Sequence, residues 1–268
     1  MARSPHKRIC CKIVVIRMAA LLLLDLLGMK GRWAKAPSVA DLAFDTFQQL
    51  IQEALEMLPS DIRVRGALES DGTALLFTHP HTAISVGRHI CRSAFALGKR
   101  VGDERFWIRG VIAPAAFNAR LRTSQALKKP FRQIEASRPA PSLLEAISVE
   151  QSGYKGMRLV IASSLVDEAL RADLRIWLGR RSVNPIRRLR YSPTVPNYFD
   201  VLWMIPDHLE TSDAWLELSK RMNKRLRWSG QDPLEFAQAS ATSLVFAECG
   251  AILARSASQA GMQWPAYF

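Results

Sequence analysis

The sequence has few of the features that mark secreted, zinc-binding or membrane-spanning proteins. Its 268 residues include only four cysteines, whose spacing fits neither a disulfide framework nor a zinc site, so we expect a reducing compartment. No run of 18 uncharged apolar residues occurs, which predicts that no segment spans a membrane. The apolar stretch near the N-terminus is interrupted by Lys12, Arg17 and Asp25 and lacks a clean cleavage site, so it is not predicted to be a secretory signal. We therefore expect a cytoplasmic protein.

Acidic residues are scarce relative to basic ones, with 24 Asp and Glu against 37 Lys and Arg and a formal net charge of +13. The excess is concentrated in two segments that contain no acid, residues 1–18 with five basic side chains and residues 175–190 with six. Because the rest of the chain is nearly neutral, a nucleic-acid partner is not expected. An apolar content of 49% excludes a disordered polyelectrolyte and predicts a folded core.

The hydrophobic pattern predicts a mixed α+β fold. A continuously apolar run at residues 19–28 is typical of a buried central strand, although its leucines would also permit a helix. Ser70-Asp71-Gly72 separates two short apolar segments and predicts a hairpin turn, and the Pro- and Arg-rich residues 120–142 predict a loop. The expected strands span residues 19–28, 62–69, 73–78, 105–113 and 156–162, and the expected helices span residues 38–58, 82–100, 143–151 and 164–178. This order predicts a ferredoxin-like antiparallel sheet covered by helices on one face.

The same pattern divides the chain into three parts. Residues 1–17 are expected to form a basic N-terminal tail, and residues 18–178 an α+β domain. Residues 179–268 show no reliable strand pattern and are expected to form a helical C-terminal extension, with helices near residues 212–228 and 232–259.

Two carboxylates, Asp25 and Asp71, are the strongest candidates for chemistry. Asp25 lies within a run of leucines, where a carboxylate is costly unless it is paired, protonated or bound to a cation. In a ferredoxin-like sheet the first strand and the central hairpin are neighbours, so both carboxylates could bind one Mg²⁺ or Mn²⁺. The turn at residues 27–31 adds backbone N–H groups and a lysine that suit a phosphate. The alternative is that Asp25 caps a turn and Asp71 is an ordinary hairpin acid, and spacing alone leaves both open.

Several short motifs resemble those of the class III nucleotidyl cyclases. The stretch LLLLDLLGMKG at residues 21–31 resembles the first strand of that family, where a metal-binding Asp precedes a Gly turn. ESDGTALLF at residues 69–77 resembles the hairpin that carries the second metal-binding Asp. RFWIRGVIA at residues 105–113 is similar to the following strand. Ser148-Val149-Glu150 and GMRLVI at residues 156–161 follow the spacing of the family's later helix and strand.

The resemblance covers about residues 18–165 and is strongest to the pyrimidine cyclases of the bacterial Pycsar anti-phage systems. It implies a phosphorus–oxygen lyase that converts UTP, or CTP in second place, to a cyclic pyrimidine monophosphate and pyrophosphate. It also implies two Mn²⁺ or Mg²⁺ ions per site, a homodimer that shares its sites between subunits, and a downstream effector that senses the product. The implied ligands are Asp25, Asp71 and the Leu26 carbonyl for the metals, and Gly28, Met29 and Lys30 for the phosphates.

The departures from adenylyl cyclases bear on the substrate and on catalysis. Ala67 stands where the resemblance places the lysine that reads adenine, so an adenine-selective site would lack its donor. Leu144 and Ser148 stand where the family has its transition-state Asn and Arg. The cations that could substitute are Arg32, Arg109, Arg120, Arg122 and Arg158.

Two other functions remain open on the sequence. A catalytically degenerate cyclase fold could act as a binding or scaffold module, which would agree with Leu144 and Ser148. A two-metal nuclease-like palm domain would use the same sheet, but it would need a third carboxylate beside the pair and a basic track for the nucleic acid.

Overall fold

The computed structural model describes residues 19–69, 71–97, 106–115, 141–151, 155–178, 181–188, 197–205, 213–228 and 233–261. The expected N-terminal tail at residues 1–17 and residues 120–140 of the expected loop lie outside these stretches.

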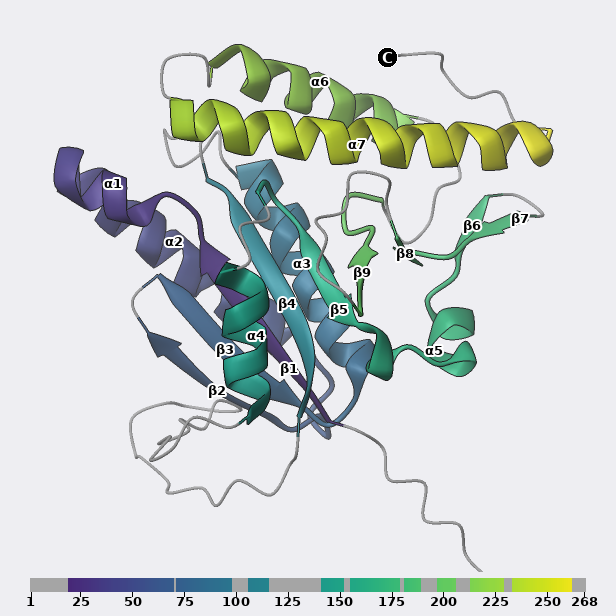
Figure 1. Ribbon diagram of the computed structural model, residues 1–268, viewed down its shortest axis with the longest axis horizontal. Helices are drawn as coiled ribbons and strands as arrows, with labels where there is room; N and C mark the ends of the chain where they lie inside the picture. The colour runs from purple at the N-terminus through teal and green to yellow at the C-terminus, as the bar shows by residue number, and fades with distance from the viewer. Residues whose placement is uncertain are drawn as a thin grey trace, which may run out of the picture.

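The described strands form a seven-stranded sheet and a separate two-stranded hairpin (Figure 1). The order in the large sheet is β2-β3-β1-β4-β5-β9-β8. Its strands are β1 (Ala19–Leu26), β2 (Val64–Glu69), β3 (Gly72–Phe77), β4 (Ile108–Ala115), β5 (Leu159–Ala162), β8 (Ile186–Arg187) and β9 (Tyr198–Val201). β4 and β5 run parallel, whereas the other neighbours run antiparallel. The predicted α+β fold with a mainly antiparallel sheet is confirmed.

β1 is a central strand, and this position explains its continuous apolar sequence. It pairs with β3 on one side and β4 on the other, so the run forms a strand and not a helix. Leu22 and Leu24 pack on one face of the sheet, and Leu21 and Leu23 pack on the other. A strand buried on both faces needs apolar residues at successive positions and not only at alternate ones.

Helices cover both faces of the sheet (Figure 1). α2 (Pro37–Glu56) and α3 (Pro80–Leu97) bury their apolar faces in the larger core cluster, together with Leu22 of β1. α4 (Pro141–Gln151) lies on the opposite face, where Ala146 and Val149 pack with the other set of strand residues. The expectation that the helices cover one face was therefore wrong, because a central strand that is apolar on both faces must be covered on both.

The helix expected at residues 164–178 is also wrong. A 3₁₀ turn, η1 (Ser163–Leu165), is followed by the six-residue α5 (Glu168–Asp173) and then by the hairpin β6 (Ile176–Leu178) and β7 (Arg181–Val183). The Asp167 carboxylate caps α5 by accepting a hydrogen bond of 2.7 Å from the Leu170 N–H. Taken together, the apolar residues of α5 and β6 are spaced much as they would be in one longer helix.

Residues beyond 179 contribute strands as well as helices, contrary to the expected helical extension. β9 pairs with β5, with Val160 opposite Asp200, and β8 pairs with β9 at the edge of the large sheet. Strands of two to four residues are too short to show a period of two, so the local sequence could not reveal them.

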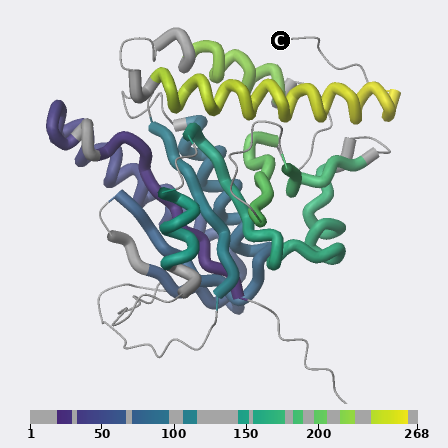
Figure 2. The backbone as a smooth tube through the Cα atoms, in the orientation of Figure 1, coloured from purple at the N-terminus to yellow at the C-terminus, as the bar shows by residue number. Residues whose placement is uncertain are grey.

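The last two helices agree with the sequence-based prediction. α6 (Asp213–Trp228) and α7 (Pro233–Gln259) lie side by side along one end of the sheet (Figure 2). Trp215 of α6 stacks on Phe246 of α7, with ring centroids 4.2 Å apart and planes 3° from parallel. This aromatic pair holds the two helices together.

α7 contains a segment, Phe236–Gln259, that is long and apolar enough to cross a membrane by length and composition. However, 44% of its most apolar window is buried within the protein. Phe246, Cys249 and Leu253 belong to the main hydrophobic core. A core helix passes the same test of length and composition, so we interpret α7 as a helix packed within the fold.

α7 also makes polar contacts with the backbone that leads into β5. The Met157 N–H donates a hydrogen bond of 2.9 Å to the Thr242 hydroxyl, and the Gly156 N–H donates to the Gln238 side-chain carbonyl. Gly156 has a φ of +84°, and a Cβ there would lie 2.8 Å from the Thr242 backbone nitrogen. Only glycine allows this close approach between α7 and the chain.

Thr242→Val is expected to lower the free energy of unfolding by about 1–3 kcal/mol, because the substitution leaves the buried Met157 N–H without its acceptor. Urea denaturation followed by circular dichroism measures this change. Ser256→Ala is the matched control, because the Ser256 hydroxyl donates to the Ile252 carbonyl of its own helix. It should change the free energy by at most about 0.5 kcal/mol, and an equally small effect of Thr242→Val would contradict the assignment.

Candidate functional site

The sheet brings the two predicted carboxylates to the same place. Asp25 lies near the end of β1, directly opposite Gly72, the first residue of β3. Asp71 precedes Gly72 in the hairpin turn, and its backbone carbonyl accepts a hydrogen bond of 2.8 Å from the Leu26 N–H. The hairpin tip is therefore tied to the end of β1, and residues 46 positions apart in the sequence become neighbours.

The environment of Asp25 disfavours an uncompensated negative charge. Burial raises the pKa of the Asp25 carboxyl above its ordinary value, the attraction of Arg109 acts in the opposite direction, and the charge of Asp71 raises the pKa further. The repulsion between the two aspartates is reduced by any cation that binds between them.

Arg109 is the cation that contacts Asp25 in this structure. It lies opposite Asp25 in the antiparallel pair of β1 and β4, which places both side chains on one face of the sheet. Its Nε and Nη2 atoms lie 3.1 and 3.0 Å from Asp25 Oδ2. Nη2 also forms an ion pair with Oε1 of Glu150 in the last turn of α4. One guanidinium thus links two carboxylates from different elements.

Glu150 was not recognised as a site residue from the sequence, and Arg109 was one of five cation candidates. The contact of Glu150 with Arg109 depends on α4 crossing the face of β4, which no local pattern reveals. The sequence does contain a signal for Arg109. Like Asp25, it is a charged residue within an apolar strand, and such a residue needs a partner of opposite charge.

Arg158, another candidate cation, belongs to a different environment. Its side chain is 3% exposed and forms an ion pair with Asp200 of β9. Its charge is therefore committed to a structural pair and is not available at the aspartates. The side chain of Arg32 and residues Arg120 and Arg122 lie outside the described part of the structure.

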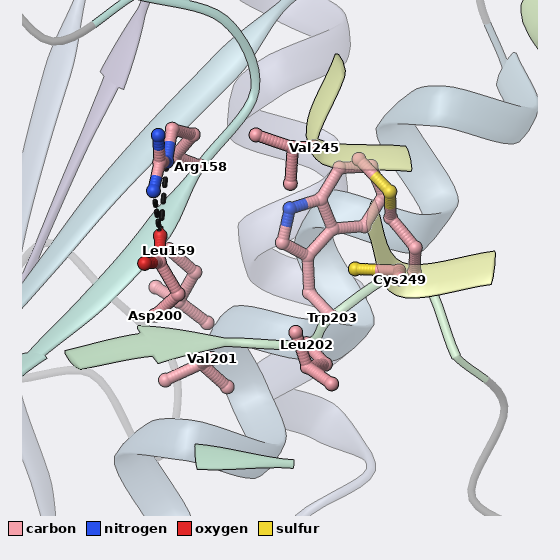
Figure 3. Close-up of a pocket in the computed structure, with 9 residues that line it drawn as sticks. Arg158, Leu159, Asp200, Val201, Leu202, Trp203, Val245 and Cys249 are labelled. Carbon is pink, nitrogen blue, oxygen red and sulfur yellow. Dashed lines mark hydrogen bonds and ion pairs between the residues drawn. The ribbon is translucent and has the colours of Figure 1, made fainter. Parts of the chain in front are cut away.

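A small pocket beside this ion pair lies between the sheet and α7 (Figure 3). Arg158, Asp200, Trp203 and Cys249 are among the residues that line it. Its cavity volume of about 10 Å³ has room for about one water molecule. Burial raises the pKa of the Cys249 thiol, which disfavours the thiolate that a nucleophile needs. We interpret the pocket as a gap in packing and not as a substrate site.

The expected phosphate turn is only partly a turn. Leu27 and Gly28 form the turn, but Met29 and Lys30 begin a short helix, α1 (Met29–Lys35). Gly28 has a φ of +80°, and a Cβ at this position would meet nothing within 4 Å. The Met29 side chain is buried, so only its backbone can contact a phosphate. The Lys30 side chain lies outside the described part of the structure.

The positions that depart from the cyclase pattern lie on β2 and α4. Ala67 pairs with Ala74 in the register of β2 and β3. Leu144 is 53% exposed on α4 and offers no polar group, and Ser148 is exposed on the same helix. Neither of these two side chains carries a charge.

The donor set fits a divalent cation that shares its coordination with substrate. Asp25 and Asp71 supply hard carboxylate oxygens, and Mg²⁺ is often bound by one or two carboxylates together with substrate phosphates. No group of three or more His, Cys, Asp or Glu side chains is arranged to hold a metal in the described part of the chain. A cation here therefore needs phosphate or water ligands as well, and at Asp25 Oδ2 it would compete with Arg109.

No protein-family model and no curated protein matches this chain. Among solved structures it is similar to an adenylate cyclase of Trypanosoma brucei in its monomeric state, with 14% identity, 69% and 90% of the two chains covered and a TM-score of 0.45. It is also similar to the guanylyl cyclase Cya2, with 16% identity, 69% and 91% coverage and a TM-score of 0.43. A bacterial light-regulated adenylyl cyclase follows with 10% identity, 78% and 97% coverage and a TM-score of 0.44. Similarity at this level does not identify a function.

Proposed function

We propose that this protein is a nucleotidyl cyclase that converts a pyrimidine nucleoside triphosphate, UTP ahead of CTP, to its cyclic monophosphate and pyrophosphate. The observation that carries the proposal is the juxtaposition of Asp25 and Asp71. These carboxylates come from the two motifs that resemble the cyclase metal motifs, and the β1–β3 pairing and the Leu26–Asp71 hydrogen bond bring them together.

The residues of this site suit in-line phosphoryl transfer. Asp25, Asp71 and the Leu26 carbonyl would hold the metal ions, and backbone N–H groups of Gly28, Met29 and Lys30 would bind the β- and γ-phosphates. Bound Mn²⁺ or Mg²⁺ would lower the pKa of the ribose 3′-hydroxyl and neutralise the triphosphate. The 3′-oxygen would bond to the α-phosphorus while the bond from the α-phosphorus to the bridging oxygen of the β-phosphate breaks. Pyrophosphate would leave with that oxygen, and the hydroxyl proton would pass to solvent water.

The preference for a pyrimidine depends on Ala67. At the position that reads adenine, a methyl group cannot donate a hydrogen bond to the base. A buried polar group that is left without its hydrogen-bond partner costs about 1–3 kcal/mol. This cost corresponds to roughly a 5–150-fold penalty. A smaller base could be read by backbone groups or by the adjacent β2 region, where Arg65 is half-buried and Arg63 is exposed.

Two further properties are part of the proposal because the sequence motifs imply them. The active protein would be a homodimer whose subunits share the sites, and its product would act on an effector that senses a cyclic pyrimidine nucleotide in anti-phage defence.

The second candidate function is a binding or scaffold module with a degenerate cyclase fold. The observation that favours it is the Asp25–Arg109–Glu150 contact, because Arg109 already neutralises one proposed metal ligand. The nuclease-like alternative is less well supported, since it needs a third carboxylate beside the pair, and no three His, Cys, Asp or Glu side chains of the described residues are arranged to hold a metal.

Incubation of the purified protein with equimolar ATP, GTP, CTP and UTP plus Mn²⁺ is expected to yield mainly a cyclic pyrimidine monophosphate. Chromatography with mass detection identifies the product, and a parallel sample with excess chelator should yield none. Mainly cyclic AMP would contradict the role of Ala67. No product from any triphosphate would favour the scaffold module.

A further inference from the structure

The contact of Arg109 with both Asp25 and Glu150 suggests how the site responds to a cation. We propose that Arg109 is an exchangeable internal counter-ion, which neutralises Asp25 in the metal-free protein and moves onto Glu150 alone when a divalent cation binds the aspartates. This inference rests on the proposed function in one respect, namely that Asp25 and Asp71 receive a divalent cation.

The geometry places Arg109 in competition with a bound cation for one oxygen of Asp25. Both Nε and Nη2 of Arg109 lie within 3.1 Å of the same oxygen, Asp25 Oδ2. A divalent cation bound to that oxygen would repel the guanidinium at short range. The side chains of Asp25, Arg109 and Glu150 are 24%, 18% and 16% exposed, so solvent screens this repulsion only in part.

Glu150 allows the exchange to take place without leaving the partly buried guanidinium unpaired. A partly buried guanidinium that lost its only carboxylate would be costly. Here Nη2 already touches Glu150, so release from Asp25 leaves an ion pair in place. In both states the Arg109 guanidinium is therefore paired with a carboxylate. Cation binding at the aspartates can shift the balance between these two states.

A titration of the full chain with Mn²⁺ alone, followed by the electron paramagnetic resonance signal of the free ion, tests this exchange without nucleotide. Arg109→Met removes the competing cation and should tighten Mn²⁺ binding by about tenfold or more. Arg109→Lys keeps the charge and should bind Mn²⁺ nearly as the wild type does. Glu150→Gln takes away the second carboxylate, which favours the Asp25-bound state, so it should weaken Mn²⁺ binding several-fold.

Arg221→Met is the matched control, because Arg221 is a 43%-exposed arginine on α6 whose loss changes the net charge equally. It should leave the Mn²⁺ affinity unchanged. Equal affinity of Arg109→Met and wild type, tighter binding by Glu150→Gln, or no binding by any variant would overturn the exchange. Thermal unfolding verifies that each variant is folded. If Arg109→Met does not fold, the Mn²⁺ affinity of Glu150→Gln by itself tests the exchange. The titration measures Mn²⁺ binding and not turnover. A negative result for the exchange can therefore be distinguished from a negative result for cyclase activity in the four-triphosphate assay.

Discussion

Asp25→Asn and Asp71→Asn are each expected to lower the rate of cyclic nucleotide formation by at least about a hundredfold. Loss of groups that only orient metal ligands costs about 10–100-fold in affinity or activity, and these carboxylates are the proposed ligands themselves. Asparagine has the shape of aspartate but not its charge, so the substitution removes cation binding with little change in packing. Single-turnover and steady-state assays with UTP and Mn²⁺ measure the loss.

The effect on stability separates a metal site from a structural role. Asp71→Asn should not lower the free energy of unfolding without metal, because it removes a charge that repels Asp25. Asp45→Asn, at an exposed position of α2, is the matched control and should keep turnover within about twofold of wild type. Full turnover of either site variant would refute the metal assignment.

Asp200→Asn is expected to lower the free energy of unfolding by about 3–5 kcal/mol, because it removes the counter-charge of a buried guanidinium. The side chains of Arg158 and Asp200 are 3% and 5% exposed, and their ion pair joins the residue that precedes β5 to β9. Arg158→Met should destabilise the protein by a similar amount, for the converse reason. Chemical denaturation at neutral pH measures both changes.

Two further variants test whether burial is the cause. The double variant Arg158→Met with Asp200→Leu replaces both charges by apolar groups and should recover most of the lost stability. Glu217→Gln disrupts an exposed ion pair with Arg221, in which the two side chains are 56% and 43% exposed, and should change stability by at most about 1 kcal/mol. An equally small effect of Asp200→Asn would show that the buried pair is not important for stability.

The long elements of this fold could be predicted from local patterns. α2 and α3 carry an apolar face over 20 and 18 residues, long enough for a helical period to be unambiguous. The unbroken leucines of β1 and the Ser70-Asp71-Gly72 turn likewise predicted a central strand beside a hairpin. α1, β8 and β9 were not predicted, because these short elements lack both the continuous apolar run that marked β5 and the turn that marked β2 and β3.

The sequence by itself determined that Asp25 needs a partner, since a carboxylate among leucines is costly wherever the strand lies. It also predicted that the hairpin with Asp71 lies beside that strand. Only the tertiary structure decided what that partner is. The register of β1 and β4 places Arg109 opposite Asp25, and the crossing of α4 over the sheet brings Glu150 to the same guanidinium. It also assigned Arg158 to Asp200, 42 positions later in the chain. These pairings depend on contacts between distant segments, and for such contacts local hydrophobic pattern and turn chemistry carry no information.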